Sequence, residues 1–206
     1  MHDFQAWKKY PQHHNWFNKL WVSEKLGYEC GPCGVAPNRS DDYIARPTYN
    51  LSGMGVGAEF IYIESGDMSK VQPGYFWQQI LRGKQYSVTY EFKDGFKPIS
   101  CYEGIRSGSE LWRFDKWVKA EHIPKLPSIV KELEDVDIIN IEYIGNDPIE
   151  FHLRGSPDPQ YDEIIPIWED RKFDIDKYRK MRYTYINSHE NADGFMDISR
   201  LGFMVK

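Results

Sequence analysis

Short segments that favour β-structure recur along this chain, separated by turns that contain glycine or proline. The clearest read "DDYIARP", "AEFIYIE", "YSVTYEF", "IINIEYIG" and "PIEFHLRG". Apolar and polar residues alternate in "YSVTYEF", which predicts a half-buried antiparallel strand, and the "DG" that follows predicts a hairpin. These segments favour a fold built largely from short antiparallel strands.

Two segments favour helix. Between Asn15 and Leu26 apolar residues recur at steps of three and four, which predicts an amphipathic helix that ends at Gly27. A second helix is expected over residues 128–133, with Ser128 as its N-cap. No linker is long enough to divide the 206 residues into independent domains.

Composition limits the classes of partner. The formal charge of −5 gives no basic excess, so nucleic acid is not favoured as a partner. No apolar run reaches the roughly 18 residues of a membrane span, and the first residues do not resemble a signal peptide. An odd number of cysteines favours free thiols over a disulfide framework. We therefore expect a cytoplasmic protein without a membrane segment.

Two of the cysteines, Cys30 and Cys33, form a C-x-x-C pair in "ECGPCG". Such a pair is half of a zinc site or a redox dithiol in some proteins. Neither a second pair nor histidines at ligand spacing accompany it, and glycine and proline surround it. We interpret the segment as a turn.

A fixed positive charge precedes a glycine-rich loop in "YIARPTYNLSGMGVGAEF". Arg46 ends the β-prone run, and the loop then carries Ser52, Gly53, Gly55 and Gly57. Glycines allow backbone N–H groups to approach a phosphate closely, and an arginine supplies charge. The segment is either a tight structural turn or a loop that closes over phosphates.

Acidic and basic side chains share one face of the two late strands. Glu150, His152 and Arg154 follow at a period of two, and Glu142 lies on the preceding strand. If the strands pair across the turn, two carboxylates and an imidazole converge, which requires a cation or a proton between them. One interpretation is a site for a hard divalent cation; the other is a solvated edge hairpin with Arg154 as the salt-bridge partner.

The order of these motifs resembles the ATP-grasp superfamily of ATP-dependent carboxylate–amine or carboxylate–thiol ligases. "NKLWVSEKLGYECGPCG" is similar to the family's lysine-bearing helix start, and "YIARPTYNLSGMGVG" to its basic strand end and glycine loop. "FWQQILRGKQYSVTY" is similar to the adenine-contacting hinge, and "NIEYIG" with "IEFHLRG" to the metal-binding strands. The resemblance spans roughly residues 15–168 and implies an α+β fold in which two lobes with antiparallel sheets hold ATP.

The resemblance also implies roles. Lys19, Arg46 and the loop with Ser52, Gly53, Gly55 and Gly57 would bind the triphosphate, and Gln78, Gln79 and Leu81 would contact the nucleotide at the hinge. Glu142, Glu150 and His152 would hold Mg²⁺, and Arg154 would act on the transferring phosphoryl group. The implied reaction activates a carboxylate as an acyl phosphate, which an amine or similar nucleophile attacks. A small lobe and hinge over 15–80, a larger lobe over 81–170 and a C-terminal tail over 171–206 are expected.

Three departures from the family pattern affect these expectations. Arg46 stands where lysine is usual, and His152 stands where asparagine is usual, which favours Mn²⁺ or a site that binds nucleotide without turnover. Because only 18 residues precede Lys19, we expect the N-terminal domain that helps to bind substrate in this family to be absent. Recognition of the unidentified carboxylate and nucleophile would then come from the tail, a partner chain or a second copy. The alternative to a ligase is a degenerate nucleotide-binding or interaction module.

Overall fold

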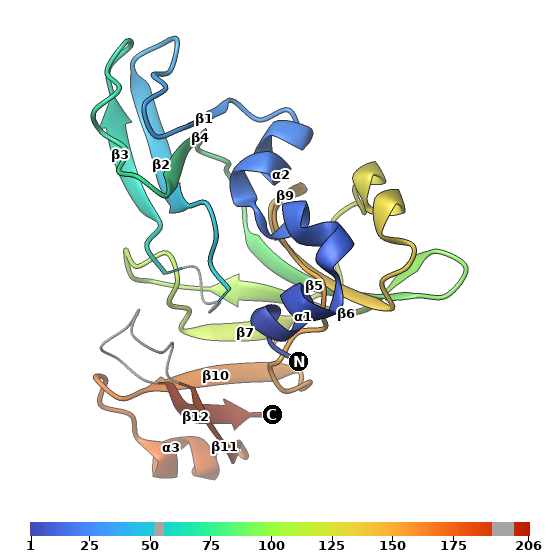
Figure 1. Ribbon diagram of the computed structural model, residues 1–206. Helices are drawn as coiled ribbons and strands as arrows, with labels where there is room; N and C mark the ends of the chain where they lie inside the picture. Colours follow the sequence, from blue (N-terminus) through green and yellow to red (C-terminus); the bar gives the residue numbers. More distant parts are fainter. Residues whose placement is uncertain (52–55, 191–199) are drawn as a thin grey trace.

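A computed structural model describes residues 1–51, 56–190 and 200–206. It consists of two antiparallel sheets with short helices, so the predicted α+β class with antiparallel sheets is confirmed. The smaller sheet has the strand order β1-β4-β2-β3, and it stands over one end of the larger sheet (Figure 1). Its strands are β1 (Cys30–Pro32), β2 (Asp41–Pro47), β3 (Glu59–Ile63) and β4 (Tyr75–Gln79).

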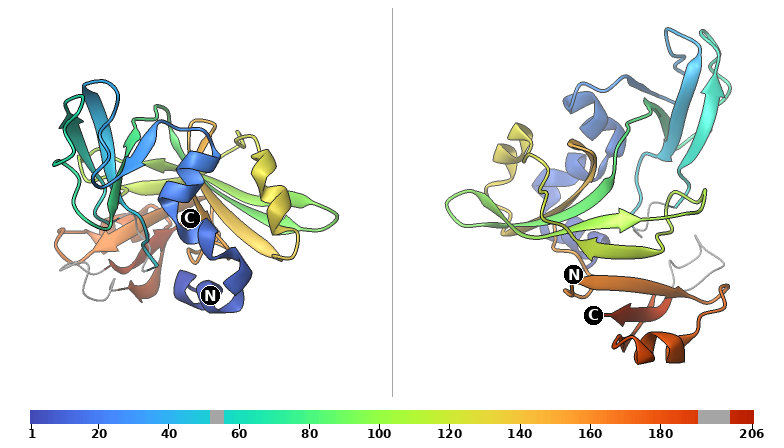
Figure 2. Two further views of the ribbon diagram at one scale, coloured as in Figure 1. Left: turned by 45° about the horizontal axis from the view of Figure 1, so that its top comes forward. Right: turned by 180° about the vertical axis from the view of Figure 1, so that it is seen from behind.

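The larger sheet has the order β11-β12-β10-β7-β6-β5-β8-β9 and is strongly curved (Figure 2). Its central strands are β5 (Gln85–Phe92), β6 (Phe96–Ile105), β7 (Lys116–Lys119), β8 (Ile138–Ile144) and β9 (Asp147–His152). The C-terminal strands β10 (Glu163–Trp168), β11 (Thr184–Glu190) and β12 (Arg200–Val205) complete it. The expected tail over 171–206 thus contributes strands to the same sheet as the late acidic strands.

The two faces of the larger sheet differ in polarity because side chains alternate along β5. Tyr86, Val88 and Tyr90 point into the main core, where they pack with apolar residues of β8, β9 and the N-terminal helices. Gln85 and Ser87, which alternate with Tyr86 and Val88, lie on the opposite face, which lines cavities. The predicted "DG" hairpin joins β5 to β6, with Asp94 and Gly95 both at positive φ, as tight hairpin turns require.

Short helices cover the apolar face of the larger sheet. They are α1 (Asp3–Lys9), the 3₁₀ helix η1 (Pro11–Phe17), α2 (Lys19–Lys25) and the 3₁₀ helix η2 (Ser128–Leu133), while α3 (Ile175–Lys180) packs beside β11. The prediction of a single helix from Asn15 to Leu26 is wrong about where the helix begins. The 3₁₀ helix ends at Phe17, and the Asn18 side chain caps a new helix by accepting a hydrogen bond from the Trp21 backbone N–H.

The second expected helix is also different in kind. Residues 128–133 form a 3₁₀ helix whose N-cap is Pro127 rather than Ser128, without a capping hydrogen bond from a side chain.

None of the helices in the described part of the chain combines the length and the apolar character that a membrane span requires.

Candidate functional site

A cavity of about 120 Å³ lies where the smaller sheet faces the larger one. Seven residues predicted from the sequence to contact nucleotide or metal line it together. They are Lys19, Arg46, Gln78, Gln79, Leu81, Glu142 and Glu150. These residues come from α2, β2, β4, the connection after β4, β8 and β9, so the fold assembles them from distant parts of the sequence. We call this space the inter-sheet cavity.

A buried ion cluster forms the charged end of the inter-sheet cavity. Lys19 Nζ lies 3.0 Å from Glu150 Oε1, and Arg46 Nη2 lies 3.8 Å from Glu150 Oε2. Burial would raise the pKa of the Glu150 carboxyl, but the charges of Lys19, His152 and Arg46 hold it below its ordinary value. Lys19, Arg46 and Glu150 are each less than a tenth exposed, so this carboxylate stays ionised among cations.

Local structure explains the position of each cation. Lys19 is the first residue of α2, which begins where Asn18 caps it. Arg46 lies at the end of β2, and its Nη2 donates to the Ile149 carbonyl oxygen on β9 at 3.0 Å. Burial lowers the pKa of Arg46, while Glu150 and Glu142 oppose that effect. Both side chains therefore reach from the smaller sheet and its helix to the larger sheet.

The two hinge glutamines have structural partners. Gln78 Oε1 accepts from Ser23 Oγ at 2.8 Å and from Arg46 Nη1 at 3.4 Å. Gln79 Oε1 accepts from the Glu29 backbone N–H at 2.8 Å. Their amide oxygens hold α2 and β1 against β4. Leu81 lies in the connection between β4 and β5, at the apolar end of the cavity.

The late strands pair as the sequence predicts. Glu142 of β8 lies opposite Glu150 of β9, and a register shift follows between Glu142 and Tyr143. His152 Nε2 lies 3.7 Å from Glu142 Oε1 and 3.8 Å from Glu150 Oε1. Glu142 Oε2 accepts from Gln85 Nε2 at 3.2 Å. The predicted convergence of two carboxylates and an imidazole on one face is therefore present.

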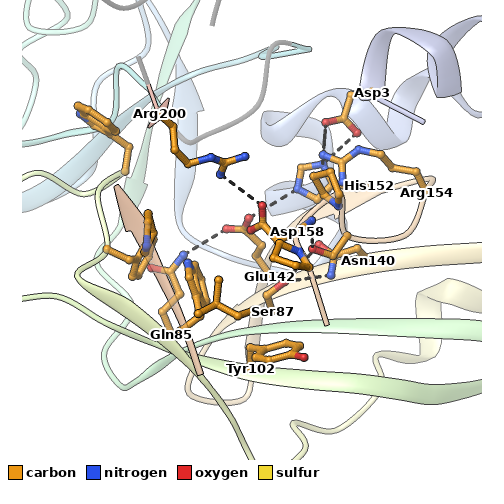
Figure 3. A pocket seen from close by; sticks show the side chains of 18 of the residues that line it. Asp3, Gln85, Ser87, Tyr102, Asn140, Glu142, His152, Arg154, Asp158 and Arg200 are labelled. Carbon is orange, nitrogen blue, oxygen red and sulfur yellow. Dashed lines mark hydrogen bonds and ion pairs between the residues drawn. The ribbon is translucent and has the colours of Figure 1, made fainter. Parts of the chain in front are cut away.

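A solvated face does not describe these residues. Glu150, His152 and Arg154 are all buried, and the partner of Arg154 is Asp3 of α1 (Figure 3). Arg154 Nη2 lies 2.7 Å from Asp3 Oδ2, and His152 Nδ1 lies 3.0 Å from Asp3 Oδ1. Burial would lower the pKa of His152, but Asp3 outweighs it and raises that pKa to about 9. An imidazole must lose its proton to ligate a metal through nitrogen, so Asp3 opposes that role.

The donor set fits a hard cation only together with another ligand. Among the described residues no group of three or more His, Cys, Asp and Glu side chains has the arrangement of a metal site. Mg²⁺ in proteins is usually held by one or two carboxylates together with water and substrate phosphates. Glu142 and Glu150 supply two carboxylates beside a cavity with two cations, which fits a cation that arrives with phosphate.

The glycine loop is only partly described. Ser52, Gly53 and Gly55 lie outside the described residues. Gly57, at the end of this loop, has a φ of +85°, and a Cβ added there would lie 2.6 Å from the Tyr75 hydroxyl oxygen. Its conformation and close packing both require glycine.

Several residues of the inter-sheet cavity were not predicted from the sequence. The apolar ones include Ile44, Phe60 and Ile144, and Arg106 adds a third cation. Phe60 is 58% exposed although it lies on a strand, directly opposite Ile44. In "EFIYI" the period of two places Phe60 and Tyr62 on the face opposite Ile61 and Ile63, which could have indicated an apolar side chain on the open face of β3. No local pattern indicates Arg106 or Asp3.

A second cavity of about 140 Å³ adjoins the first, and Gln85, Leu111 and Glu142 line both. It lies over the polar face of the larger sheet, and Figure 3 shows its charged side chains. His152 and Arg154 line this second cavity rather than the inter-sheet cavity. Apart from Gly57, which lines neither cavity, the predicted site residues within the described part of the chain therefore divide between two cavities that share Glu142.

The cysteines show no arrangement for chemistry. Cys30, Cys33 and Cys101 are free thiols, as predicted. Cys30 lies in strand β1, not only in a turn, and burial raises the pKa of its thiol to about 11. A thiol with this pKa is a poor nucleophile and a poor metal ligand at neutral pH.

Comparisons with known proteins give little more. No protein-family model and no curated protein matches the sequence. One similar solved structure is that of a "putative ATP-grasp superfamily protein" from Archaeoglobus fulgidus. The match has 16% identity and a TM-score of 0.37, covering 68% of this chain and 46% of that one. This chain thus spans less than half of the matched protein. The matched protein carries the family name that the sequence motifs resemble, but similarity this low carries no argument about function.

Proposed function

We propose that this protein binds a nucleoside triphosphate, ATP by resemblance, in the inter-sheet cavity and uses it to join a carboxylate to an amine or similar nucleophile. One observation carries the proposal: seven residues, chosen from the sequence for these roles, line one cavity although they lie on six separate segments. A chance resemblance of loose motifs gives no reason for such convergence.

The residues that line the cavity suit the two halves of a nucleotide, but its volume of about 120 Å³ has room for one ring, so the two sheets would have to move apart to admit the whole molecule. Ile44, Phe60, Leu81 and Ile144 offer apolar surface for a flat base. Lys19 and Arg46, at the other end, offer positive charge for phosphates in a buried setting where electrostatic interactions are strong. Arg106 adds to this charge. Glu150 now balances the charges of the two cations. With nucleotide bound, it would do so only in part and would also hold a metal ion.

Glu142 and Glu150 are the proposed ligands of Mg²⁺, with His152 as a third ligand only in its neutral form and then with Mn²⁺ favoured. When bound, the ion would neutralise charge on the phosphates. Arg154 of the second cavity would stabilise the charge that develops as the γ-phosphoryl group leaves ADP and bonds to a carboxylate oxygen. An amine then bonds to the acyl carbon, inorganic phosphate leaves, and the amine proton passes to solvent.

A specific observation favours the rival proposal of a nucleotide-binding module without turnover. Glu150 already holds Lys19 at 3.0 Å and Arg46 at 3.8 Å, so both cations have a partner before phosphate arrives. A site stabilised in this way could bind nucleotide weakly and never align it. ADP release in the presence of a carboxylate and an amine distinguishes the two proposals.

The first test is the melting temperature with Mg²⁺ and ATP, Mn²⁺ and ATP, and each component alone. A ligand that binds only the folded state at about 100 times its Kd adds roughly 2.7 kcal/mol of stability. We expect a rise that requires metal and nucleotide together. Glu142→Gln and Glu150→Gln should each reduce the rise, measured from the melting temperature of each variant without ligand.

Glu132→Gln is the matched control, because Glu132 makes a surface pair with Lys25 away from both cavities. It should keep the full rise. If Mg²⁺ together with ATP does not raise the melting temperature of the unaltered protein, the proposal that it binds nucleotide is wrong. The inter-sheet cavity is then only a packing feature. A rise that both cavity variants keep would instead contradict the metal assignment.

A further inference from the structure

The second cavity has an aromatic wall. Five aromatic side chains from β6, β7, β10 and the segment before β7 line it: Tyr102, Trp112, Phe114, Trp117 and Trp168. Trp112 and Trp168 meet edge to face at 5.3 Å, and Phe114 lies 4.2 Å from Trp117. Trp112 and Trp117 are only half-buried, so part of their rings faces the cavity. Such a wall favours a flat ring, because aromatic rings attract one another at these separations.

The size of the cavity agrees with one ring. Its volume is about 140 Å³. A dry protein cavity of roughly 150 Å³ accepts benzene, so this space suits a single six-membered ring with a short substituent. A polymer could enter only by one residue or one end.

Cations line the polar part of the same cavity. Arg154 donates through Nη1 to the Gly155 carbonyl oxygen and through Nη2 to Asp3, which fixes its planar guanidinium. Arg200 of β12 pairs with Asp158 at 3.3 Å and lies 4.4 Å above the Phe203 ring. The Arg154 guanidinium carries five N–H donors, so it can donate to a further acceptor. A planar guanidinium favours a carboxylate as the polar group of the ligand.

The second cavity opens toward the site of the proposed phosphoryl transfer. Glu142, a proposed metal ligand, lines both cavities, and so do Gln85 and Leu111. A carboxylate held near Arg154 would therefore lie toward the phosphate end of the inter-sheet cavity. Trp168 and Arg200, which come from β10 and β12, make the C-terminal strands part of this site.

We propose that the second cavity binds the acceptor substrate and that this acceptor is a small carboxylic acid with an aromatic ring. The ring would lie against Trp112 and Trp117, and the carboxylate would lie against Arg154. The role of this ligand as acceptor substrate rests on the proposed function. The aromatic carboxylate site itself depends only on the second cavity.

The test measures binding of three probes without nucleotide, by quenching of tryptophan fluorescence and by calorimetry. Phenylacetate carries the ring and the carboxylate, cyclohexylacetate replaces the flat ring by a saturated one, and phenethylamine reverses the charge. We expect saturable binding of phenylacetate, roughly fivefold weaker binding of cyclohexylacetate, and at least about tenfold weaker binding of phenethylamine. Trp112→Leu and Trp117→Leu should each weaken phenylacetate binding, measured by calorimetry.

Trp21→Leu is the matched control, because Trp21 is half-buried against Trp16 on the helical side of the sheet and lines neither cavity. It should keep phenylacetate binding. Equal binding of cyclohexylacetate, equal binding of phenethylamine, or no binding of phenylacetate overturns the proposal.

A parallel titration with Mg²⁺ and ATP separates this proposal from the proposed function. Phenylacetate binding without a nucleotide effect would support the aromatic carboxylate site and contradict the ligase. A nucleotide effect without phenylacetate binding would leave nucleotide binding intact and overturn the aromatic acceptor. Phenylacetate-dependent ADP release with an added amine, reduced with cyclohexylacetate at the same concentration, would support both.

Discussion

At the scale of single residues, Asp3 is a buried carboxylate of the N-terminal helix with two basic partners. It is 3% exposed, and it is the carboxylate beside both His152 and Arg154. Asp3→Asn would remove the carboxylate that pairs with the buried Arg154, and removal of one partner from a buried ion pair costs about 3–5 kcal/mol. We expect a loss of unfolding free energy of that order, measured by urea denaturation. Asp137→Asn, at a surface pair with Lys9, should change stability little.

The same residue sets a dependence on pH. Burial would raise the pKa of Asp3, but His152 and Arg154 hold it far below the ordinary value. A carboxyl whose pKa is lower in the folded state stabilises the fold above its unfolded pKa of about 4, and this contribution is lost as the pH falls further. The unfolding free energy should therefore decrease below about pH 4, and Asp3→Asn should decrease less steeply. Equal acid slopes in the two proteins would contradict this role.

Cys30 offers a second test at this scale. Because its pKa is raised to about 11, very little thiolate exists at pH 8. Alkylation of Cys30 by iodoacetamide should be about a hundredfold slower at pH 8 than that of a free thiol, and it should accelerate up to about pH 11. Peptide mapping by mass spectrometry measures this rate separately for each cysteine. Fast alkylation at pH 8 would revive a redox interpretation of the C-x-x-C pair.

The site residues also show what local sequence can predict. Glu142, Glu150 and His152 follow from strand alternation, because a period of two fixes the face on which each side chain lies. Asp3 could not be predicted, since its partners lie about 150 positions away and only the docking of α1 brings them together. A charge pattern along the chain contains no information about such a contact.

At the scale of elements, strands were more predictable than helices. Alternation and turn signals identified β2, β3, β5 and β8 to within a residue or two. The strand predicted over 148–155 is wrong at its end, because β9 ends at His152 and Arg154 follows it. The helices here have only six or seven residues, and two of them are 3₁₀ helices. In such short segments packing decides the boundaries, because local propensity contributes too little.

Strand β10 shows why the C-terminal part was missed. "EIIPIW" contains Pro166, which argues against a central strand. The structure explains why a proline is tolerated here. Strand β10 pairs with β7 only at Glu163 and Ile164, so Pro166 lies beyond the part of β10 that β7 covers. Its missing N–H costs no bond of the β7 ladder.

Gly104 makes a testable contribution within β6. A Cβ there would lie 2.6 Å from Phe114 and 2.8 Å from Trp117, both of which line the second cavity. Gly104→Ala should cost about 1–3 kcal/mol of unfolding free energy, because the two rings must move within a packed site. Gly108→Ala is the control, since the nearest atom to an added Cβ there is 4.0 Å away. Similar urea midpoints for both variants would contradict the tight packing.

At the scale of the whole molecule, the two sheets are linked by one connection and by contacts at β9. The chain passes directly from β4 to β5 through residues 80–84. Beyond this connection, Tyr28 donates to the Pro148 carbonyl oxygen at 3.0 Å, and Arg46 donates to the Ile149 carbonyl oxygen. The inter-sheet cavity lies beside these contacts, so the placement of the smaller sheet determines whether its residues converge.

Tyr28→Phe tests this link without altering any residue that lines the inter-sheet cavity. It removes the hydroxyl that donates to Pro148, and a lost hydrogen bond of this kind costs about 0.5–1.5 kcal/mol. Because the bond holds the smaller sheet to the larger one, amide hydrogen exchange should become faster in β1, β2 and β4, while exchange in β5 and β8 stays unchanged. Tyr62→Phe, at an exposed tyrosine of β3, should alter neither. Faster exchange in both sheets would mean that they open as a single cooperative unit, and residues 80–84 would then not act as a hinge.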